Sequence, residues 1–260
     1  MRIALGIEYC GRAYLGWERQ KEGLAVQEVL ENALARVATV PVRTYCAGRT
    51  DTGVHAYGQV VHFDCPLARP MQAWLRGTNT YLPDDVRVRW AQLVPDTFHA
   101  RFRAFRRYYR YVVFNDPVAP AIAKGLVTWE YRDLQLAAMQ RAAQALVGTH
   151  DFDAYRASRC QAPSPVRTIY DLTLSQSRQL IYIDVHANGF LHHMVRNIVG
   201  VLLDIGAGQR PPQWAAEVLA GRDRRCGGVT AKPDGLYFVN VSYPEDFNIP
   251  VTLPTSPAFW

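Results

Sequence analysis

The sequence predicts a mixed α+β protein in which one order of elements (strand, helix, two strands, helix, strand) occurs twice. Two observations support this fold class. Several short runs alternate apolar and polar residues, as half-buried strands do, and the stretches between them space apolar residues as helices do. The 260 residues are 49% hydrophobic and 20% charged, which is typical of a globular protein.

The first half of the chain shows this order once. Helices are predicted from Val26 to just before Pro41 and near 70–77, and strands at 2–9, 42–47, 58–64 and 86–94. In the first helix, Val26, Leu30 and Ala33 recur at helical spacing, which places Glu28 and Glu31 on the solvent side.

The order recurs in the second half. Helices are predicted at 133–147, 190–206 and 211–220, and strands at 105–114, 168–175, 179–187 and 236–242. We therefore predict two ferredoxin-like (split βαβ, RRM-like) halves, with largely antiparallel sheets and helices on one face. The halves are 1–104 and 105–245, and 246–260 is an irregular tail.

The charge and the cysteine content indicate which partner and which cellular compartment the protein suits. A net charge of +6 is carried by 26 Arg and only 3 Lys, which is compatible with an RNA partner, although a GC-rich genome produces the same bias. Five cysteines without a C-x-x-C pair predict free thiols in a reducing cytoplasm. The strand-like start predicts that there is no signal peptide, and the lack of a long apolar run predicts that there is no membrane span.

The stretch 47–56 is the strongest candidate for a reactive site. Asp51 and Arg49 lie two residues apart between Gly48 and Gly53, in a loop that connects two predicted strands and that glycine allows to bend tightly. Two interpretations remain open. The loop is either a surface turn with an exposed ion pair worth about 0–1 kcal/mol, or a site that uses the carboxylate.

A second candidate is the segment 101–111, which contains five Arg and five aromatic residues. On a strand, Arg107 and Tyr109 would share one face, and Tyr108 and Arg110 the other. Such a surface suits phosphates and stacked bases. The alternative is a core strand whose arginines reach outward to solvent.

A third candidate is the predicted helix at 190–206, where Arg196 interrupts an apolar run. A buried cation needs a partner, and Asp51 is one candidate. The adjacent residues His192 and His193 would point roughly 100° apart on a helix, so we expect no shared metal ion. Phosphate-loop, dinucleotide-binding and nucleophile-elbow motifs are absent, and we expect neither a metal nor a cofactor.

Several motifs in order resemble the TruA-type tRNA pseudouridine synthase family over essentially the full length. They are Gly48-Arg-Thr-Asp-Thr-Gly-Val-His55, Tyr14-Leu-Gly-Trp17, Val26-Gln-Glu28, Gly58-Gln-Val-Val-His-Phe63, Tyr109-Arg-Tyr111, Ser164-Pro-Val-Arg-Thr168, His192-His-Met-Val-Arg-Asn197 and Gly235-Leu-Tyr237. Small departures are Cys10, where Asp is common, and Thr52, where Ala is usual.

The resemblance implies a homodimeric, cofactor-free isomerase that converts uridines 38, 39 and 40 of the tRNA anticodon arm to pseudouridine. It implies that Asp51 is the nucleophile, that Arg196 pairs with it, that Tyr109 stacks on the uracil and that Arg49 assists base flipping. The further tRNA contacts that it implies are Arg69, Phe98, His99, Ala100, Arg101, Phe102, Arg159, Cys160, Gln161 and Leu236.

Two other classes of function remain open. A non-catalytic RNA-binding or RNA-folding module would also use an aromatic and basic sheet face, but it would release no tritium from 5-tritiated uridine. A small-molecule hydrolase with Asp51 as its base would show no salt-sensitive affinity for tRNA.

Overall fold

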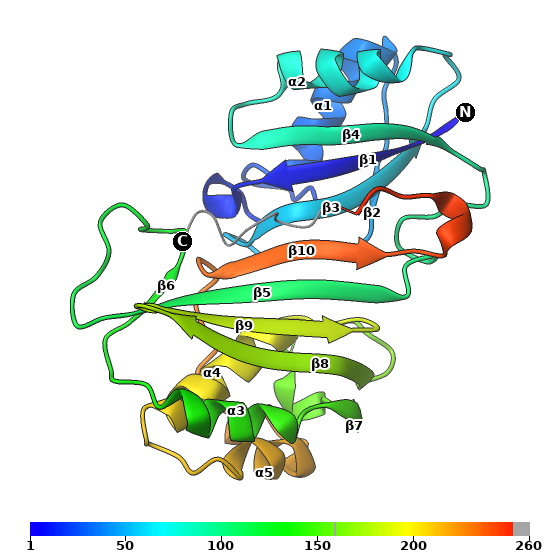
Figure 1. Cartoon of the computed structure of the whole chain (residues 1–260). Helices are drawn as coiled ribbons and strands as arrows, with labels where there is room; N and C mark the ends of the chain where they lie inside the picture. The colour runs from blue at the N-terminus through cyan, green and yellow to red at the C-terminus, as the bar shows by residue number, and fades with distance from the viewer. Residues whose placement is uncertain (159, 252–260) are drawn as a thin grey trace. The chain divides into compact units, whose positions relative to one another are not determined.

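The computed structural model describes residues 1–158 and 160–251 (Figure 1), and the chain forms two compact units. Unit 1 comprises Met1–Arg107 together with the described residues from Tyr237 onward, and unit 2 comprises Tyr108–Leu236. The pattern predicted a division after residue 104, whereas the units divide after Arg107, and the last strand belongs almost wholly to unit 1.

The sheet of unit 1 is centred on β1 (Arg2–Tyr9), β3 (His55–Asp64) and β4 (Val86–Val94). β1 lies between β3 and β4 and is antiparallel to both. The edge of β3 pairs with two further strands, antiparallel with the short β2 (Tyr45–Cys46) and parallel with β10 (Leu236–Ser242).

The helices of unit 1 bury the apolar residues that predicted them. α1 (Val26–Ala38) buries Val26, Leu30 and Leu34. A helical stretch over 71–81 contains a π-helix, Ala73–Gly77, and then α2 (Thr78–Tyr81). α1 and α2 lie side by side (Figure 1), and Trp74 of the π-helix packs edge-to-face on Phe63 of β3.

In unit 2, β5 (Arg106–Asn115) lies beside β9 (Leu180–Ala187), which pairs with β8 (Val166–Ser177), and β8 with β7 (Gly148–Asp151). The β7–β8 and β8–β9 pairs are antiparallel, whereas β6 (Thr128–Glu130) is parallel to β5. The helices are α3 (Leu136–Gln144), α4 (Met194–Gly206) and α5 (Trp214–Gly221). Short 3-10 turns are η1 (Gly11–Ala13), η3 (Asp153–Tyr155), η4 (Arg224–Cys226) and η5 (Glu245–Phe247).

The described residues therefore form a mixed α/β protein with mostly antiparallel strands and five α-helices, as the pattern predicted at this level. All five cysteines are free thiols. Over the part of the chain that the structure describes, every helix is too short or too polar to span a bilayer.

The predicted strand at 42–47 is wrong in length, because only Tyr45 and Cys46 pair with β3. The reason lies in α1. Glu31 accepts hydrogen bonds from the backbone N (2.8 Å) and the hydroxyl (3.0 Å) of Thr44, so a helix side chain satisfies the backbone that the sheet would otherwise pair. Glu31 therefore does not lie on the solvent side, as its helical position suggested.

The helix predicted from residue 190 begins only at Met194. His193 has a left-handed backbone with φ 61°, so it and His192 form the turn before the helix. Their rings lie 4.0 Å apart, so the prediction that helical geometry separates the two histidine side chains is wrong. The other helices differ from prediction at their ends only, where helix boundaries are least sharply defined.

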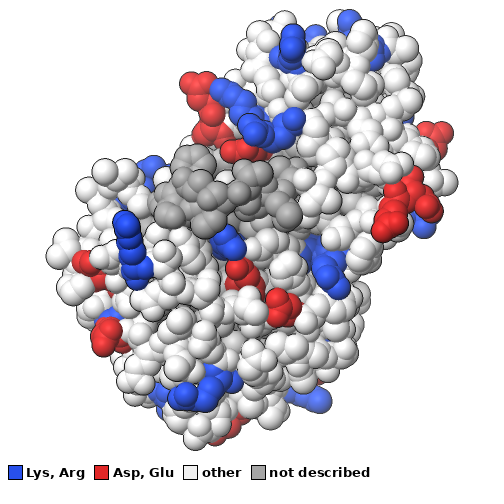
Figure 2. Space-filling model, viewed as in Figure 1, with Lys and Arg blue, Asp and Glu red and all other residues white. Residues whose placement is uncertain are grey.

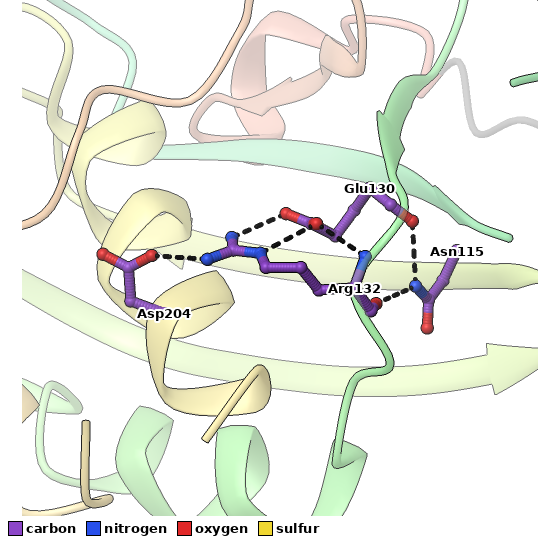
Figure 3. Close-up of polar contacts among 4 residues, drawn as sticks. All are labelled: Asn115, Glu130, Arg132 and Asp204. Atoms are coloured by element: carbon purple, nitrogen blue, oxygen red, sulfur yellow. Dashed lines mark hydrogen bonds and ion pairs between the residues drawn. The ribbon is translucent and has the colours of Figure 1, made fainter. Parts of the chain in front are cut away.

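A polar cluster braces unit 2 (Figure 3). Arg132 donates to both carboxylate oxygens of Glu130, at 2.9 and 2.7 Å, and to Asp204 of α4 at 3.1 Å. The side-chain amide of Asn115 donates to the carbonyls of Glu130 and Arg132. Together these bonds fix the segment that follows β6 against β5 and α4.

We expect Arg132→Ala to lower the free energy of unfolding by about 2–4 kcal/mol, because the side chain of Glu130 is only 8% exposed and would keep its charge without a counter-ion. Urea denaturation measures the change. The matched control is Arg225→Ala, since Arg225 also pairs with a carboxylate two residues away but is 90% exposed, and its unfolding midpoint should match wild type. Equal losses in both variants would contradict the role of burial.

Candidate active site

The loop that carries Asp51 is fixed by the segment that follows β1. The backbone N–H of Trp17 donates to the Thr50 carbonyl at 3.0 Å, and that of Gly53 to the Tyr14 carbonyl at 3.2 Å. The hydroxyls of Tyr9 and Thr50 are hydrogen-bonded at 2.7 Å in the core. Asp51 therefore lies on a backbone held on both sides by buried groups.

Two glycines make this close approach possible. Gly16 has φ +99°, and a Cβ there would lie 2.6 Å from the Thr50 carbonyl oxygen. A Cβ at Gly11 would lie 2.0 Å from the carbonyl oxygen of Val54. Any side chain at either position would push the Asp51 loop away, because both contacts are with backbone atoms.

The strand side of the loop is held by a buried amide. Gln59, which is fully buried, accepts from the Gly48 N–H at 3.3 Å and donates to the Gly48 carbonyl at 2.5 Å. Nδ1 of His55 accepts from the Gly11 N–H at 3.1 Å, and its ring stacks on Tyr237 at 4.7 Å. The loop is thus preorganised rather than free to rearrange.

Within the loop, Asp51 is half-buried and Arg49 is exposed. The guanidinium of Arg49 pairs with Glu18 at 2.5 Å rather than with Asp51, so the interpretation of the loop as a turn closed by an Arg49–Asp51 ion pair does not hold. β3 also begins at His55, three residues earlier than predicted, which makes the loop shorter and tighter.

The segment 98–102 divides between core and surface. Phe98 and Ala100 are fully buried, whereas Phe102 is 74% exposed. His99 is half-buried and contacts Phe102 at a ring distance of 4.3 Å, and the exposed Arg101 lies 5.6 Å from the Phe102 ring. The side chains available to a ligand are therefore those of His99, Arg101 and Phe102.

Arg69 lies in the loop between β3 and the helical stretch at 71–81. It is half-buried, and its Nε is buried without a hydrogen-bond acceptor among the described residues.

Arg107 serves the fold of unit 1. Its guanidinium donates to the carbonyls of Ala104 (3.1 Å), Arg101 (2.8 Å) and Ala47 (3.2 Å). It thereby ties the turn at 101–104 to the start of the Asp51 loop.

In unit 2, Tyr109 of β5 is 8% exposed and meets Phe190 edge-to-face at 4.9 Å. Its neighbours on the opposite face, Tyr108 and Arg110, both bind Asp184 of β9 at 2.7 Å. Burial, together with the carboxylate beside it, raises the pKa of Tyr108. The charge of Arg110 is therefore paired with a carboxylate that is distant in sequence, which reduces the basic character of this face.

Arg196, on α4, is half-buried. Its Nε donates to the Ala231 carbonyl at 2.8 Å, and its own carbonyl accepts from the Ala231 N–H at 3.1 Å. A Cβ at Gly200, one turn further on, would lie 1.9 Å from the Val229 carbonyl oxygen. Segment 229–231 therefore packs directly on α4 and fixes one edge of the guanidinium.

The remaining predicted contacts lie in unit 2. The Sγ of Cys160 accepts from the His192 N–H at 3.5 Å, Gln161 is exposed, and Leu236 is 4% exposed. Arg159 lies outside the described residues. The sequence reasoning missed Glu18 and Gln59, and only Gln59 left a signal, as a polar residue within the apolar strand 58–64.

Charge is dispersed on the face shown in Figure 2, where basic and acidic side chains lie among neutral ones. The net charge of +6 is therefore not gathered into one stripe over the described residues in that view.

A buried histidine makes unit 1 sensitive to acid. His62 is 2% exposed, and burial, aided by the nearby charges of His99 and Arg2, lowers its pKa to about 4 from an ordinary 6.5. The unfolded chain takes up this proton as the pH falls from 6.5 to 4, whereas the native protein resists it. We expect the free energy of unfolding to be fully present above pH 6.5 and to fall by about 2–3 kcal/mol across this window.

Denaturant titrations at several pH values measure this loss. His62→Asn is the control, because its side-chain oxygen can replace the ring nitrogen that accepts from the Ala100 N–H without titrating. The variant should show a flatter dependence on pH, and a slope equal to that of wild type would assign the effect to other groups.

Comparison with known proteins places the chain in a family. The family model described as tRNA pseudouridine synthase matches residues 6–103 and 142–244. The tRNA pseudouridine synthase A of Pseudomonas aeruginosa is 57% identical over 250 residues, covering 96% of this chain and 88% of that protein. The Alcanivorax borkumensis and Shewanella denitrificans proteins of the same name are 54% and 50% identical, over 96% of this chain and 94% and 96% of theirs.

A chain of a solved archaeal box H/ACA Nop10–Cbf5 complex is 13% identical and aligns with 77% of this chain and 44% of the complex's chain, with a TM-score of 0.34. The sequence matches define the class as isomerases that act on tRNA. Within that class, the chain belongs to the tRNA pseudouridine synthase family.

Proposed function

We propose that this protein converts uridines 38, 39 and 40 of the tRNA anticodon arm to pseudouridine, with Asp51 as the nucleophile. The observation that carries the proposal is the fixed loop. Buried groups hold the backbone at Thr50 and Gly53 on both sides of Asp51, while the carboxylate itself is only half-buried. A reactive group held in place without being sealed in the core is what a catalytic carboxylate requires.

The reaction breaks the N1–C1′ glycosidic bond and forms a C5–C1′ bond, and the proton that leaves C5 balances the one that N1 gains. There is no net redox change. An ionised carboxylate can begin the reaction by attacking the base, by attacking the sugar, or by removing a sugar proton to give a glycal. All three routes need the detached uracil to be kept in place.

Tyr109 is proposed to stack on this uracil. Its ring is already positioned by the edge-to-face contact with Phe190, which favours a fixed platform. Arg196 is proposed to pair with Asp51, and the Ala231 carbonyl that holds its Nε would orient the rest of the guanidinium. Arg49 is proposed to assist flipping of the uridine. Its surface pair with Glu18 is weak enough to exchange for a phosphate or a vacated base position.

The remaining substrate contacts are proposed from Arg69 and from the accessible groups of 98–102 and 159–161, with Leu236 beside the base. We further propose that each half of the chain is ferredoxin-like. In unit 1 the strand order β4-β1-β3-β2, with helices after β1 and after β3, supports this. A homodimer follows from the family resemblance, and a cytoplasmic location is consistent with five free thiols.

Pseudouridine mapping on unmodified tRNA incubated with the purified protein tests the proposal. New pseudouridine should appear at uridines among positions 38–40 and nowhere else, together with tritium release from 5-tritiated uridine in those tRNAs. Binding of tRNA without tritium release would instead favour a non-catalytic RNA-binding module.

A further inference from the structure

Unit 2 contains a cleft of about 390 Å³ beside the turns η3 and η4. None of its lining residues belongs to the Asp51 loop or to β5. Its lining is unusually rich in charge and consists of Asp153, Arg156, Ala157, Ser158, Arg222, Asp223 and Arg224.

Both carboxylates of the cleft already have a cation. Asp153 lies 2.5 Å from Nε of Arg156, as an ion pair without hydrogen-bond geometry, since that oxygen makes no hydrogen bond. Asp223 binds Arg225 through both carboxylate oxygens, at 2.8 to 3.1 Å. Arg222 lies 3.5 Å from Asp151 and is 69% exposed. Among the described residues, Arg224 is therefore the cation of the lining that pairs with no carboxylate.

Arg224 is held in place by neutral groups. Its Nη2 donates to the side-chain oxygen of Asn197 (3.0 Å), the Gly228 carbonyl (2.8 Å) and the Thr230 hydroxyl (3.0 Å). Its Nε and Nη1 have no acceptor among residues 1–158 and 160–251, and no carboxylate of that part of the chain pairs with it. Burial lowers the pKa of Arg224, although the guanidinium stays charged at neutral pH.

A positioned, half-buried cation with unused donors is costly unless an anion completes it. Asn197 reinforces the geometry, because this amide is 2% exposed, donates to the Tyr155 carbonyl at 2.7 Å and also accepts from Thr230 at 2.7 Å. The guanidinium therefore cannot swing away to solvent without breaking a buried network. Such fixed arginine donors suit the tetrahedral oxygens of a phosphate.

We propose that this cleft binds one backbone phosphate of tRNA, with Arg224 as the fixed donor and Arg222 as a second, exposed donor. The assignment to tRNA rests on the proposed function, whereas the phosphate chemistry rests on the cleft alone. A contact to the backbone carries no sequence information and would set the register of the RNA on unit 2.

The salt dependence of tRNA binding measures this contact directly. Loss of one phosphate contact should lower the slope of log Kd against log salt concentration by about 0.7–1 and weaken binding by about 3–10-fold at moderate salt. We expect both effects in Arg224→Gln. Arg224→Lys keeps the positive charge and should therefore keep the slope. It loses the hydrogen bonds to the three acceptors, so its melting temperature should fall as that of Arg224→Gln does.

Two further variants complete the design. Arg222→Gln loses an exposed contact with Asp151 but leaves the buried network of Arg224 intact. It should also lower the slope, which keeps the proposal testable if Arg224→Gln does not fold. Arg141→Gln removes an exposed charge on α3 and should leave the slope unchanged. Slopes equal to wild type in both Arg224→Gln and Arg222→Gln would overturn the proposal and leave Arg224 a purely structural role.

Inorganic phosphate separates the two sources of the anion. Melting temperatures are compared in phosphate and in chloride at equal ionic strength. Suppose that phosphate raises the melting temperature of wild type but not of Arg224→Gln, and that the two proteins have the same salt slope for tRNA binding. The cleft then binds free phosphate, and the tRNA assignment is overturned. The binding measurement does not depend on turnover. If pseudouridine mapping found no product, the proposed reaction would be refuted, but the salt slopes would still test the phosphate contact.

Discussion

Replacing Asp51 with Asn is expected to reduce pseudouridine formation by at least about 10³-fold, because the amide cannot act as a nucleophile or as a base. Affinity for tRNA should change little, since phosphate contacts elsewhere supply most of it. The change is nearly isosteric, and the loop is held by the backbone of Thr50 and Gly53 rather than by the carboxylate, so the fold should be retained. Tritium release from 5-tritiated uridine in tRNA measures the turnover.

The control is Asp84→Asn, which removes a carboxylate from the surface of the same unit. Among residues 1–158 and 160–251, Asp84 pairs only with Arg87 and at an exposed position, so its removal should leave turnover near that of wild type. Turnover by Asp51→Asn within about tenfold of wild type would exclude the nucleophile assignment, while a parallel loss of tRNA binding would point to a damaged loop instead.

Replacing Gly11 with Ala is expected to disable the same site from a distance. The added Cβ would lie 2.0 Å from the Val54 carbonyl oxygen, and neither backbone can yield without moving the Asp51 loop. We expect turnover to fall by about 10²-fold or more and the free energy of unfolding to fall by about 2–4 kcal/mol. Stopped tritium-release assays and urea denaturation measure the two effects.

Gly221→Ala is the matched control. A Cβ there meets nothing within 4 Å, and the residue ends α5, so alanine should be neutral or slightly stabilising. If Gly11→Ala kept normal turnover, the loop would have to tolerate displacement, and the view that its fixed geometry supports catalysis would be abandoned.

The elements that the sequence predicted well are those whose own residues decide them. α1 was recognised because Val26, Leu30 and Leu34 repeat at the helical period and are buried in the structure. β9 was recognised because Ile181, Ile183 and Val185 alternate with polar residues, and all three are buried. In both cases the local pattern and the tertiary packing agree.

The elements that were misplaced depend on partners that are remote in the sequence. β2 is short because Glu31 takes the hydrogen bonds of Thr44. β3 starts early because His55 pairs with Tyr237 of β10. The start of α4 is set by a left-handed His193, a conformation that periodicity does not reveal.

The candidate loop was found from its own residues, whereas its supports were not. The local sequence does not reveal that Gly11 and Gly16 approach Val54 and Thr50, because these contacts arise only in the folded structure. The pairing of Arg110 with Asp184 was equally invisible, since no local pattern links a strand to a carboxylate more than 70 residues away. The family motifs implied roles for Asp51, Tyr109 and Arg196, but not their geometry.

The pairing of β10 with β3 has a consequence for biosynthesis. The strand that covers the edge of β3 at His55 and Ala56 is translated after almost all of the chain, although the Asp51 loop and its supports come from the first quarter. Until β10 emerges from the ribosome, the Asp51 loop adjoins an open strand edge that can recruit other chains. A message cut short before β10 would therefore yield an aggregation-prone fragment rather than a smaller enzyme.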